Sequence, residues 1–163
     1  MAAEGSVHPE VMVREARGDD LAVIGQLATL AVDEQREGRG GAVWSRREAR
    51  ADAESSISAA MESETTRVFV GLLDEVVVAY AVFSVETLTD GGQLGRIEDL
   101  FVAPEGRGIG LGEALMESVT DAARAARCFG IDAFVLPGNR VAKNFFEASG
   151  LTARAIIVHR SLD

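Results

Sequence analysis

The chain has 163 residues and a formal net charge of −10, with 26 acidic side chains against 16 basic ones. An apolar fraction of 47% and a charged fraction of 26% are typical of a globular domain, not of a disordered or fibrous protein. A surface this acidic repels phosphate backbones, so we do not expect a nucleic-acid partner. No apolar run approaches the ~18 residues that a membrane span needs, and the first ten residues lack the pattern of a secretory signal. The composition therefore predicts a cytoplasmic protein without a membrane anchor.

The same composition limits covalent and metal-based stabilisation. A single cysteine, Cys128, excludes a disulfide framework within the chain, and no Cys/His cluster indicates a metal site. No linker or internal repeat divides the sequence. We therefore expect residues 1–10 to form a flexible tail and residues 11–163 to form a single domain.

Hydrophobic periodicity predicts a strand and two helices in the first part of the chain. A short strand at residues 11–15 leads to Gly18-Asp19-Asp20, where either aspartate can cap a helix with apolar residues at helical spacing. The capping-box pattern at residues 45–48 predicts the start of a second helix, whose apolar face continues to Met61.

The second part of the chain alternates strands, turns and helices. Three antiparallel strands are predicted at residues 68–73, 76–85 and 96–102. A helix at 111–127, a strand at 131–136, a helix capped by Asn139 that ends at Gly150, and a last strand at 153–160 follow. This order predicts an α+β domain with a mixed sheet, flanked by helices around one core.

The sharpest motif lies between the strand at 96–102 and the next helix, and it reads Pro104-Glu105-Gly106-Arg107-Gly108-Ile109-Gly110-Leu111-Gly112. Glycines let the backbone turn so that several N–H groups point into one concavity, and the helix N-terminus adds positive potential. We therefore expect this loop to bind phosphate. Neither the dinucleotide fingerprint G-x-G-x-x-G nor the P-loop tripeptide Gly-Lys-Ser/Thr fits this run.

The spacing Arg107-x-x-Gly110-x-Gly112 resembles the acyl-CoA pyrophosphate loop of the GCN5-related N-acetyltransferases. The strand from Ile97 to Val102 and the run from Asn139 to Leu151 resemble two further signatures of that family, and the three occur in the family's order. The resemblance covers residues 11–160. It implies the family's fold, a mixed, mostly antiparallel sheet of about six to seven strands with a splayed pair, flanked by four helices.

The resemblance also implies an acetyl-CoA site. In this family the strand before the loop carries a bulge and splays from the next strand, and the pantetheine arm pairs with the open edge. The residues implied are Leu100, Phe101 and Val102 for backbone pairing with the arm, Asn139 for contact with its amides, and Arg107, Gly108, Ile109, Gly110, Leu111 and Gly112 for the pyrophosphate.

Glu98 is the candidate general base. An alkylamine has a pKa of about 10 and must lose a proton before it attacks. The run Glu-Asp-Leu-Phe-Val resembles diamine and aminoglycoside acetyltransferases, in which a glutamate is the proposed base. Strand alternation turns Asp99 to the other face, although a bulge can redirect it, so Asp99 is the second candidate. The alternative is an ion-paired or solvated Glu98, and a backbone N–H near Leu100 would stabilise the developing negative charge.

Phe146 departs from the family pattern. It is implied to be a cofactor-binding residue, at the position where the family usually has a tyrosine whose hydroxyl protonates the leaving thiolate. Phenylalanine cannot do this, so either water supplies the proton or the thiolate leaves unprotonated. This departure keeps open a non-catalytic acyl-CoA-binding or sensor domain.

The acceptor pocket is the least patterned part of the sequence. In the family, the segment that joins the first two helices lines this pocket, which places Trp44 there. Glu34 and Asp90 would add negative charge suited to a cationic amine. Simple packing of Trp44 and solvation of the two carboxylates are the alternatives.

The resemblance therefore implies an acetyl-CoA-dependent N-acetyltransferase without a metal. It would transfer the acetyl group directly to a primary amine of a small molecule, polyamine-like or aminoglycoside-like. A protein or peptide acetyltransferase and the sensor domain are the alternatives. The expected partners are acetyl-CoA and the amine, and a homodimer stays open because dimers are common in that family.

Overall fold

A computed structural model describes residues 9–162 of the chain. The expected tail at residues 1–10 lies outside this range except for Pro9 and Glu10, which are exposed. Within residues 9–162, no helix is both long and apolar enough to span a bilayer.

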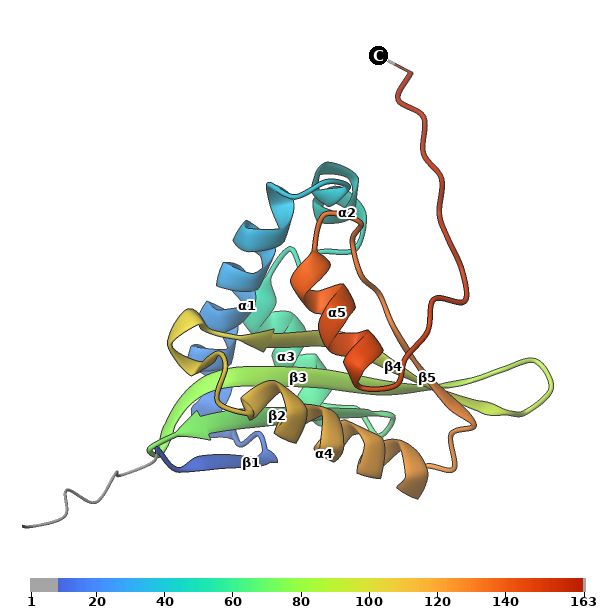
Figure 1. The fold of residues 1–163 in the computed structure, drawn as a ribbon. Helices are drawn as coiled ribbons and strands as arrows, with labels where there is room; N and C mark the ends of the chain where they lie inside the picture. Colours follow the sequence, from blue (N-terminus) through green and yellow to red (C-terminus); the bar gives the residue numbers. More distant parts are fainter. Residues whose placement is uncertain (1–8, 163) are drawn as a thin grey trace, which may run out of the picture.

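A single five-stranded sheet forms the centre of the molecule (Figure 1). Its strands are β1 (Val11–Glu15), β2 (Thr66–Leu73), β3 (Val76–Thr87), β4 (Gln93–Val102) and β5 (Gly130–Ala133), in the order β1-β2-β3-β4-β5. The first three pairings are antiparallel, and β4 pairs with β5 in parallel. The tight β2–β3 turn is made by Asp74 and Glu75, both at positive φ, as a two-residue hairpin turn with the twist of the strands requires.

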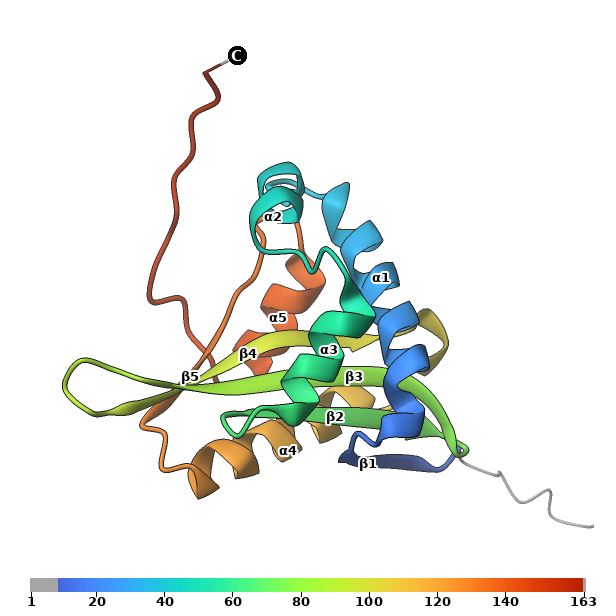
Figure 2. The ribbon, with the colours of Figure 1, turned by 180° about the vertical axis from the view of Figure 1, so that it is seen from behind.

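Helices cover both faces of the sheet. Figure 1 shows α4 (Leu111–Ala125) and α5 (Arg140–Ala148) in front of the sheet, and Figure 2 shows α1 (Leu21–Arg36) and α3 (Ala53–Glu62) on the opposite face. The short helix α2 (Gly41–Arg47) lies beyond one side of the sheet, and the 3-10 turns η1 (Gly18–Asp20) and η2 (Pro104–Gly106) precede α1 and α4. The middle of β3 is almost fully buried between the two helical layers. Its Tyr80, Val82 and Phe83 are among the largest fully buried side chains.

The expected helix that begins at residues 45–48 is wrong, because two helices occupy this region. Ser45 lies inside α2, where its hydroxyl donates to the Ala42 carbonyl over 3.1 Å. The second of these helices, α3, begins after its N-cap residue Asp52. The Asp52 carboxylate accepts the Ser55 N–H at 3.1 Å and so satisfies a free donor of the first turn of α3. The described chain therefore has five α-helices instead of the four expected.

The expected last strand at residues 153–160 is also wrong. Residues 152–162 have no secondary structure and are exposed, and they run away from the body in both views (Figures 1 and 2). The β-branched side chains of Ile156, Ile157 and Val158 favour a strand, but a strand forms only where a second strand supplies hydrogen bonds. The described sheet thus has five strands, not six or seven.

Candidate functional site

A β-bulge at Glu98 divides β4 into two halves. In the pairing with β3, Ile97 lies opposite Phe83 and Asp99 lies opposite Val82, so Glu98 is an extra residue without a partner. On its other side, β4 pairs with β5 only from Leu94 to Ile97. From Glu98 to Val102, about 13 Å at ~3.3 Å per residue, β4 therefore has an open edge. The expected bulge and splayed pair are present, and β5 is shorter than the expected strand at 131–136.

The bulge brings two carboxylates onto one arginine. The Arg50 guanidinium, from the loop between α2 and α3, donates to Asp99 Oδ2 at 2.6 Å and to Glu98 Oε2 at 3.1 Å. It also donates to the Ser56 hydroxyl on α3. The Arg50 side chain is 15% exposed and that of Glu98 is 35% exposed. The extra residue has therefore turned Asp99 toward the same cation as its neighbour, which strict alternation would not allow.

Burial governs the protonation of this cluster. It raises the pKa of Asp99 above its ordinary value, although the Arg50 charge opposes the shift. Burial also raises the pKa of Tyr80 well above its ordinary value, and the nearby Asp99 carboxylate adds to this shift. For Arg50, burial alone would lower the pKa, but pairing with Asp99 and Glu98 raises it. The cluster thus holds one permanent cation beside two carboxylates. Of these, Asp99 binds a proton more readily than an ordinary aspartate does.

The loop before α4 presents free backbone donors. Gly108 and Gly110 have φ of +75° and +91°, which L side chains rarely adopt, and a Cβ at either position would meet no atom within 4 Å. Within residues 9–162, the N–H groups of residues 108–113 form no hydrogen bond. These donors lie at the N-terminus of a 15-residue helix. Such a cluster of amides has the geometry and potential to hold a phosphate group.

The other two glycines of the loop serve packing. A Cβ on Gly106 would lie 3.0 Å from Val78 and about as close to Leu111, and a Cβ on Gly112 would lie 3.1 Å from the Phe145 ring. The four glycines therefore divide into two that shape the open concavity and two that let the loop pack closely against the domain.

Arg107 spans the loop and the open edge of β4. Its Nε donates to the Val102 carbonyl at 2.8 Å, and its guanidinium carbon lies 5.6 Å from the centre of the Phe101 ring. One terminal nitrogen contacts both oxygens of Glu34, near the end of α1, at 2.9 Å. The arginine is thus placed at the end of the open edge and beside the free amides, with half of its side chain exposed.

The family follows from a match that spans most of the chain. Residues 30–151 match the family model described as "Acetyltransferase (GNAT) family". The chain belongs to the GNAT acetyltransferase family. A comparison with curated proteins found no match.

Several solved structures share the fold of this chain at low sequence identity. A tetramutant of the BH1408 protein from Bacillus halodurans is 24% identical, with a TM-score of 0.78 over 93% of this chain and 99% of that one. The aminoglycoside N-acetyltransferase AAC(6')-Iy in complex with CoA is 15% identical, with a TM-score of 0.70 over 96% and 97% of the two chains. Glucosamine-6-phosphate N-acetyltransferase from Arabidopsis thaliana is 18% identical, with a TM-score of 0.66 over 94% and 99%.

The structure places two of the predicted site residues in helix-capping and packing roles. The side-chain oxygen of Asn139 accepts the Ala142 N–H at 3.0 Å and caps α5, which leaves the side-chain NH₂ for other contacts. Phe146 is buried and packs edge-on against Phe145, with ring centres 5.2 Å apart. Both residues belong to the helix that packs on the loop through Gly112.

The predicted acceptor residues do not come together. Glu34 contacts the loop arginine, and Trp44 is half-buried on α2. Asp90 lies in the exposed β3–β4 turn, where its carboxylate accepts the Gly92 N–H at 2.9 Å. Gln93, at the start of β4, is already about 16 Å from Glu98 along the strand at ~3.3 Å per residue. Asp90 therefore lies apart from the other site residues.

Arg50 is the residue of the candidate site that the sequence did not predict. It is one of 15 arginines, and no motif surrounds it. An indirect argument could have predicted it, because two adjacent carboxylates at a bulge need a nearby cation. The single helix predicted across residues 45–61 left no loop in the region that supplies this cation. Within the described residues, no group of three or more His, Cys, Asp or Glu side chains is arranged to hold a metal ion.

Proposed function

We propose that this GNAT acetyltransferase transfers an acetyl group from acetyl-CoA directly to a primary amine of a small molecule. The observation that carries the proposal is the open edge of β4, which runs from the Glu98 carboxylate to Arg107 and the free amides of the loop. One continuous surface thus offers backbone groups for an extended amide-containing arm, donors for a diphosphate and a carboxylate for a proton.

In this proposal, residues of the chain are assigned to the pyrophosphate and to the pantetheine arm of the cofactor. The N–H groups of Gly108, Ile109, Gly110, Leu111 and Gly112 would hold the pyrophosphate together with Arg107. For that contact Arg107 must leave Glu34, with which it forms an exposed ion pair of a kind worth only ~0–1 kcal/mol. The backbone of Leu100, Phe101 and Val102 would pair with the pantetheine arm, and the Asn139 amide would face it from α5.

Glu98 is the proposed general base. When acetyl-CoA is bound, its thioester supplies the electrophilic carbonyl. The neutral amine nitrogen attacks that carbonyl, the amine proton passes to the Glu98 carboxylate directly or through water, and the C–S bond breaks to release the CoA thiolate. The 35% exposure of Glu98 allows this proton to return to solvent. A backbone N–H near Leu100, on the open half of β4, would stabilise the negative charge on the oxygen.

Arg50 and Asp99 act as positioning residues in this proposal. The guanidinium fixes both carboxylates at the bulge, and Asp99 is the more buried of the two. Because α3 also contacts Arg50 through Ser56, the loop between α2 and α3 links the acceptor side of the domain to the base. An acceptor that moves this loop would therefore change the environment of Glu98.

A second function, a non-catalytic acyl-CoA-binding or sensor domain, is favoured by two observations. Phe146 has no hydroxyl to protonate a leaving thiolate, and Arg50 already holds both carboxylates. A thiol with a pKa of about 8.5 can leave without a proton donor, and a missing general acid typically lowers a rate by ~10²–10⁴-fold. Acetyl transfer is therefore still feasible without the tyrosine, with a lower rate of transfer.

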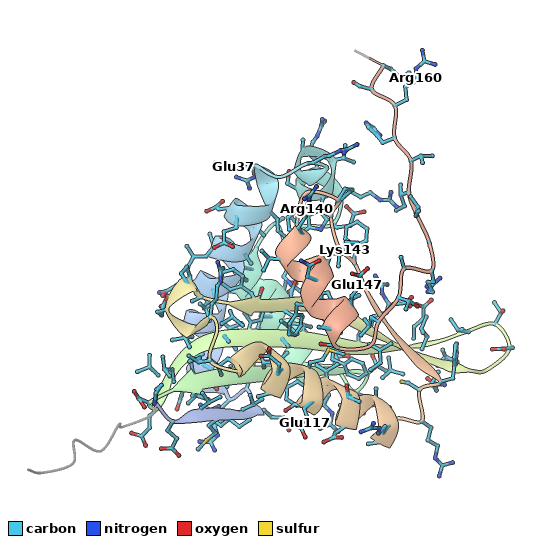
Figure 3. The ribbon with its side chains drawn as sticks, in the orientation of Figure 1. Glu37, Glu117, Arg140, Lys143, Glu147 and Arg160 are labelled. Carbon is cyan, nitrogen blue, oxygen red and sulfur yellow. The ribbon has the colours of Figure 1, made fainter. Side chains whose placement is uncertain are left out.

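The deciding experiment measures thiol release from acetyl-CoA with a panel of polyamines, aminoglycosides, simple alkylamines and peptides. We expect release above the amine-free control with at least one small amine, and a loss of kcat/KM of about 10²-fold or more in Glu98→Gln. Glu117→Gln, on the exposed face of α4 (Figure 3), is the matched control and should leave the rate unchanged. CoA binding by calorimetry without release for any acceptor would instead establish the sensor, and release with peptides alone would assign a peptide acceptor.

A further inference from the structure

Arg96 lies on the face of the sheet that carries the proposed base. It pairs with Ser84 of β3, whereas Asp99 pairs with Val82 of the same strand. Side chains alternate along a strand, so Ser84 and Val82 share one face, and their two partners on β4 share it too. The Glu98 carboxylate is also on this face, since it contacts the same guanidinium as its neighbour Asp99. Arg96 and Glu98 are about 7 Å apart along β4 at ~3.3 Å per residue.

Arg96 differs from the other arginines of the sheet because it has no counterion. Arg14 on β1 and Arg67 on β2 each form an ion pair with a carboxylate. The Arg96 side chain is exposed, and within residues 9–162 it forms neither an ion pair nor a hydrogen bond. Asp132 lies directly opposite Arg96 on β5 and would be its natural partner.

A second arginine occupies the Asp132 carboxylate. Arg154, in the segment after α5, donates from Nε to Oδ1 of Asp132 over 2.7 Å, and one of its terminal nitrogens contacts Oδ2. This hydrogen bonding is the main cause that lowers the pKa of Asp132, against the effect of burial, whereas Arg96 acts on Asp132 only through its charge. Both oxygens of Asp132 are thus in use. The five N–H donors of Arg96 stay free for an anion from outside the chain.

The charge on this face of the sheet differs from that of the chain as a whole, which is −10. Three cations and four carboxylates gather here: Arg50, Arg96, Arg154, Glu86, Glu98, Asp99 and Asp132. Two of the cations are saturated by carboxylates, and Arg96 is the one with donors left. Because salt screens charges beyond about 8–10 Å, an anion that reaches Arg96 is governed by this local cation more than by the overall negative charge.

We propose that Arg96 binds an anionic group of the acceptor, a carboxylate or a phosphate, and so places the acceptor amine beside Glu98. This inference rests on the acetyl transfer proposed above and narrows its acceptor to small amines that also carry a negative group. A guanidinium suits this role because its forked N–H donors bind a carboxylate or a phosphate through two parallel hydrogen bonds. The spacing along β4 predicts an amine and an anionic group about 5–8 Å apart. Arg154 is a positioning residue, since it keeps Asp132 from Arg96.

Acetyl transfer to three amines of equal chain length tests the inference. γ-Aminobutyrate, butylamine and putrescine carry a negative, a neutral and a positive end group, and thiol release from acetyl-CoA gives kcat/KM for each. We expect kcat/KM to be at least about tenfold higher with γ-aminobutyrate than with butylamine, because charge-assisted hydrogen bonds favour the anionic end. β-Alanine and phosphoethanolamine, in which the same two-carbon spacer separates the amine from the end group, distinguish a carboxylate from a phosphate by their relative kcat/KM.

Variants of Arg96 assign the preference to this residue. Arg96→Gln should reduce the preference for γ-aminobutyrate over butylamine at least about tenfold, mainly through KM. Arg96→Glu should reverse the preference in favour of putrescine. Arg124→Gln is the matched control, because it removes an exposed cation from α4 on the opposite face of the sheet, and it should keep the preference of the unmodified enzyme.

Arg154→Gln tests why Arg96 is free. Asp132 then becomes available to Arg96, and the preference for γ-aminobutyrate should fall about two- to fivefold, as competition from a partly exposed carboxylate implies. Adding Asp132→Asn should restore the preference, which a merely structural role of Arg154 does not predict. Circular dichroism checks that each variant is folded.

Nuclear magnetic resonance gives a readout that does not depend on turnover. Titration of the protein with γ-aminobutyrate, with CoA present, should shift the amide signals of Arg96 and Asp132 in a saturable way, and Arg96→Gln should abolish the shift at Asp132. Transfer to butylamine or putrescine as efficient as transfer to γ-aminobutyrate would overturn this inference and leave the proposed function intact. Absence of transfer to every acceptor would instead refute the proposed function, and the titration alone would then decide the anion site, which a lack of saturable shifts would overturn.

Discussion

Replacement of Arg50 tests the carboxylate cluster most directly. Arg50→Met keeps most of the length of the side chain and removes the charge that Glu98 and Asp99 share at 3.1 and 2.6 Å. Removal of one partner of a fully buried ion pair costs about 3–5 kcal/mol. Because Glu98 is 35% exposed, water compensates part of this loss. We therefore expect the free energy of unfolding to fall by about 2–3 kcal/mol at neutral pH.

The loss should depend on pH in a defined direction. Burial raises the pKa of Asp99 and Arg50 lowers it, so Arg50→Met raises the pKa of Asp99 further. A group whose pKa is raised on folding stabilises the folded state below its unfolded pKa, and this contribution is lost as pH rises through the folded pKa. The deficit of Arg50→Met relative to the unmodified protein should thus be larger at about pH 8 than at about pH 5.

Urea unfolding followed by circular dichroism at the two pH values measures the deficit. Arg124→Gln is the control, since Arg124 and Asp121 are 76% and 68% exposed and should contribute less than ~0.5 kcal/mol. Adding Asp99→Asn to Arg50→Met should recover part of the stability, because an uncharged amide needs no cation. A deficit below ~0.5 kcal/mol, or one that is larger at acidic pH, would refute the reasoning.

Three further predictions concern other charged and reactive groups. Arg107→Ala should weaken CoA binding measured by calorimetry about 10-fold or more, as loss of a charge-assisted contact implies. Glu34→Gln should instead strengthen CoA binding up to ~5-fold, because it frees Arg107 from its ion pair. Equal affinities in both variants would contradict the assignment of the loop. Hydrogen bonding from Arg14 lowers the pKa of Asp20 against the effect of burial. The ionised Asp20 therefore stabilises the folded state above the ordinary pKa of aspartate, and this contribution is lost as pH falls through the lowered pKa. The cost of Asp20→Asn in urea unfolding should thus shrink below about pH 4. Burial raises the pKa of the Cys128 thiol, so its alkylation by iodoacetamide at neutral pH should be slower than that of free cysteine, and an equal rate would exclude this effect.

Patterns carried by neighbouring residues predicted most of the fold. The hairpin turn at Asp74 and Glu75, the cap at Asn139 and the terminating glycine Gly150 depend on local chemistry, and each lies where it was expected. The split of the second helix was missed because the apolar spacing from Ala49 to Met61 continues across the break between α2 and α3, where Arg50 forms its tertiary contacts. Periodicity reports which face is buried and does not report whether the chain stays helical between two apolar residues.

In the candidate site, too, the sequence predicted the features that consecutive residues carry and missed the contacts between residues far apart in the chain. The position of the bulge and the open loop came from the resemblance of consecutive residues, and the structure has both. The contacts of Glu34 and Arg50 join residues 73 and 48 or 49 positions apart. No single-sequence pattern specifies such pairs, since they depend on how α1 and the loop between α2 and α3 fold over the sheet. The assignment of Glu98 as the base stays a prediction for the kinetic experiment.

The bulge at Glu98 also makes this site unusually sensitive to chain length. Without that one residue, Asp99 would return to the alternation of an ordinary strand and β4 could continue its ladder with residues beyond Ala133. Deletion of the Glu98 codon would therefore remove one carboxylate and close the open edge of β4 at the same time, while leaving the hydrophobic composition of the strand almost unchanged. Substitution scans cannot sample this event, because the open edge depends on the number of residues in β4 as well as on their identity.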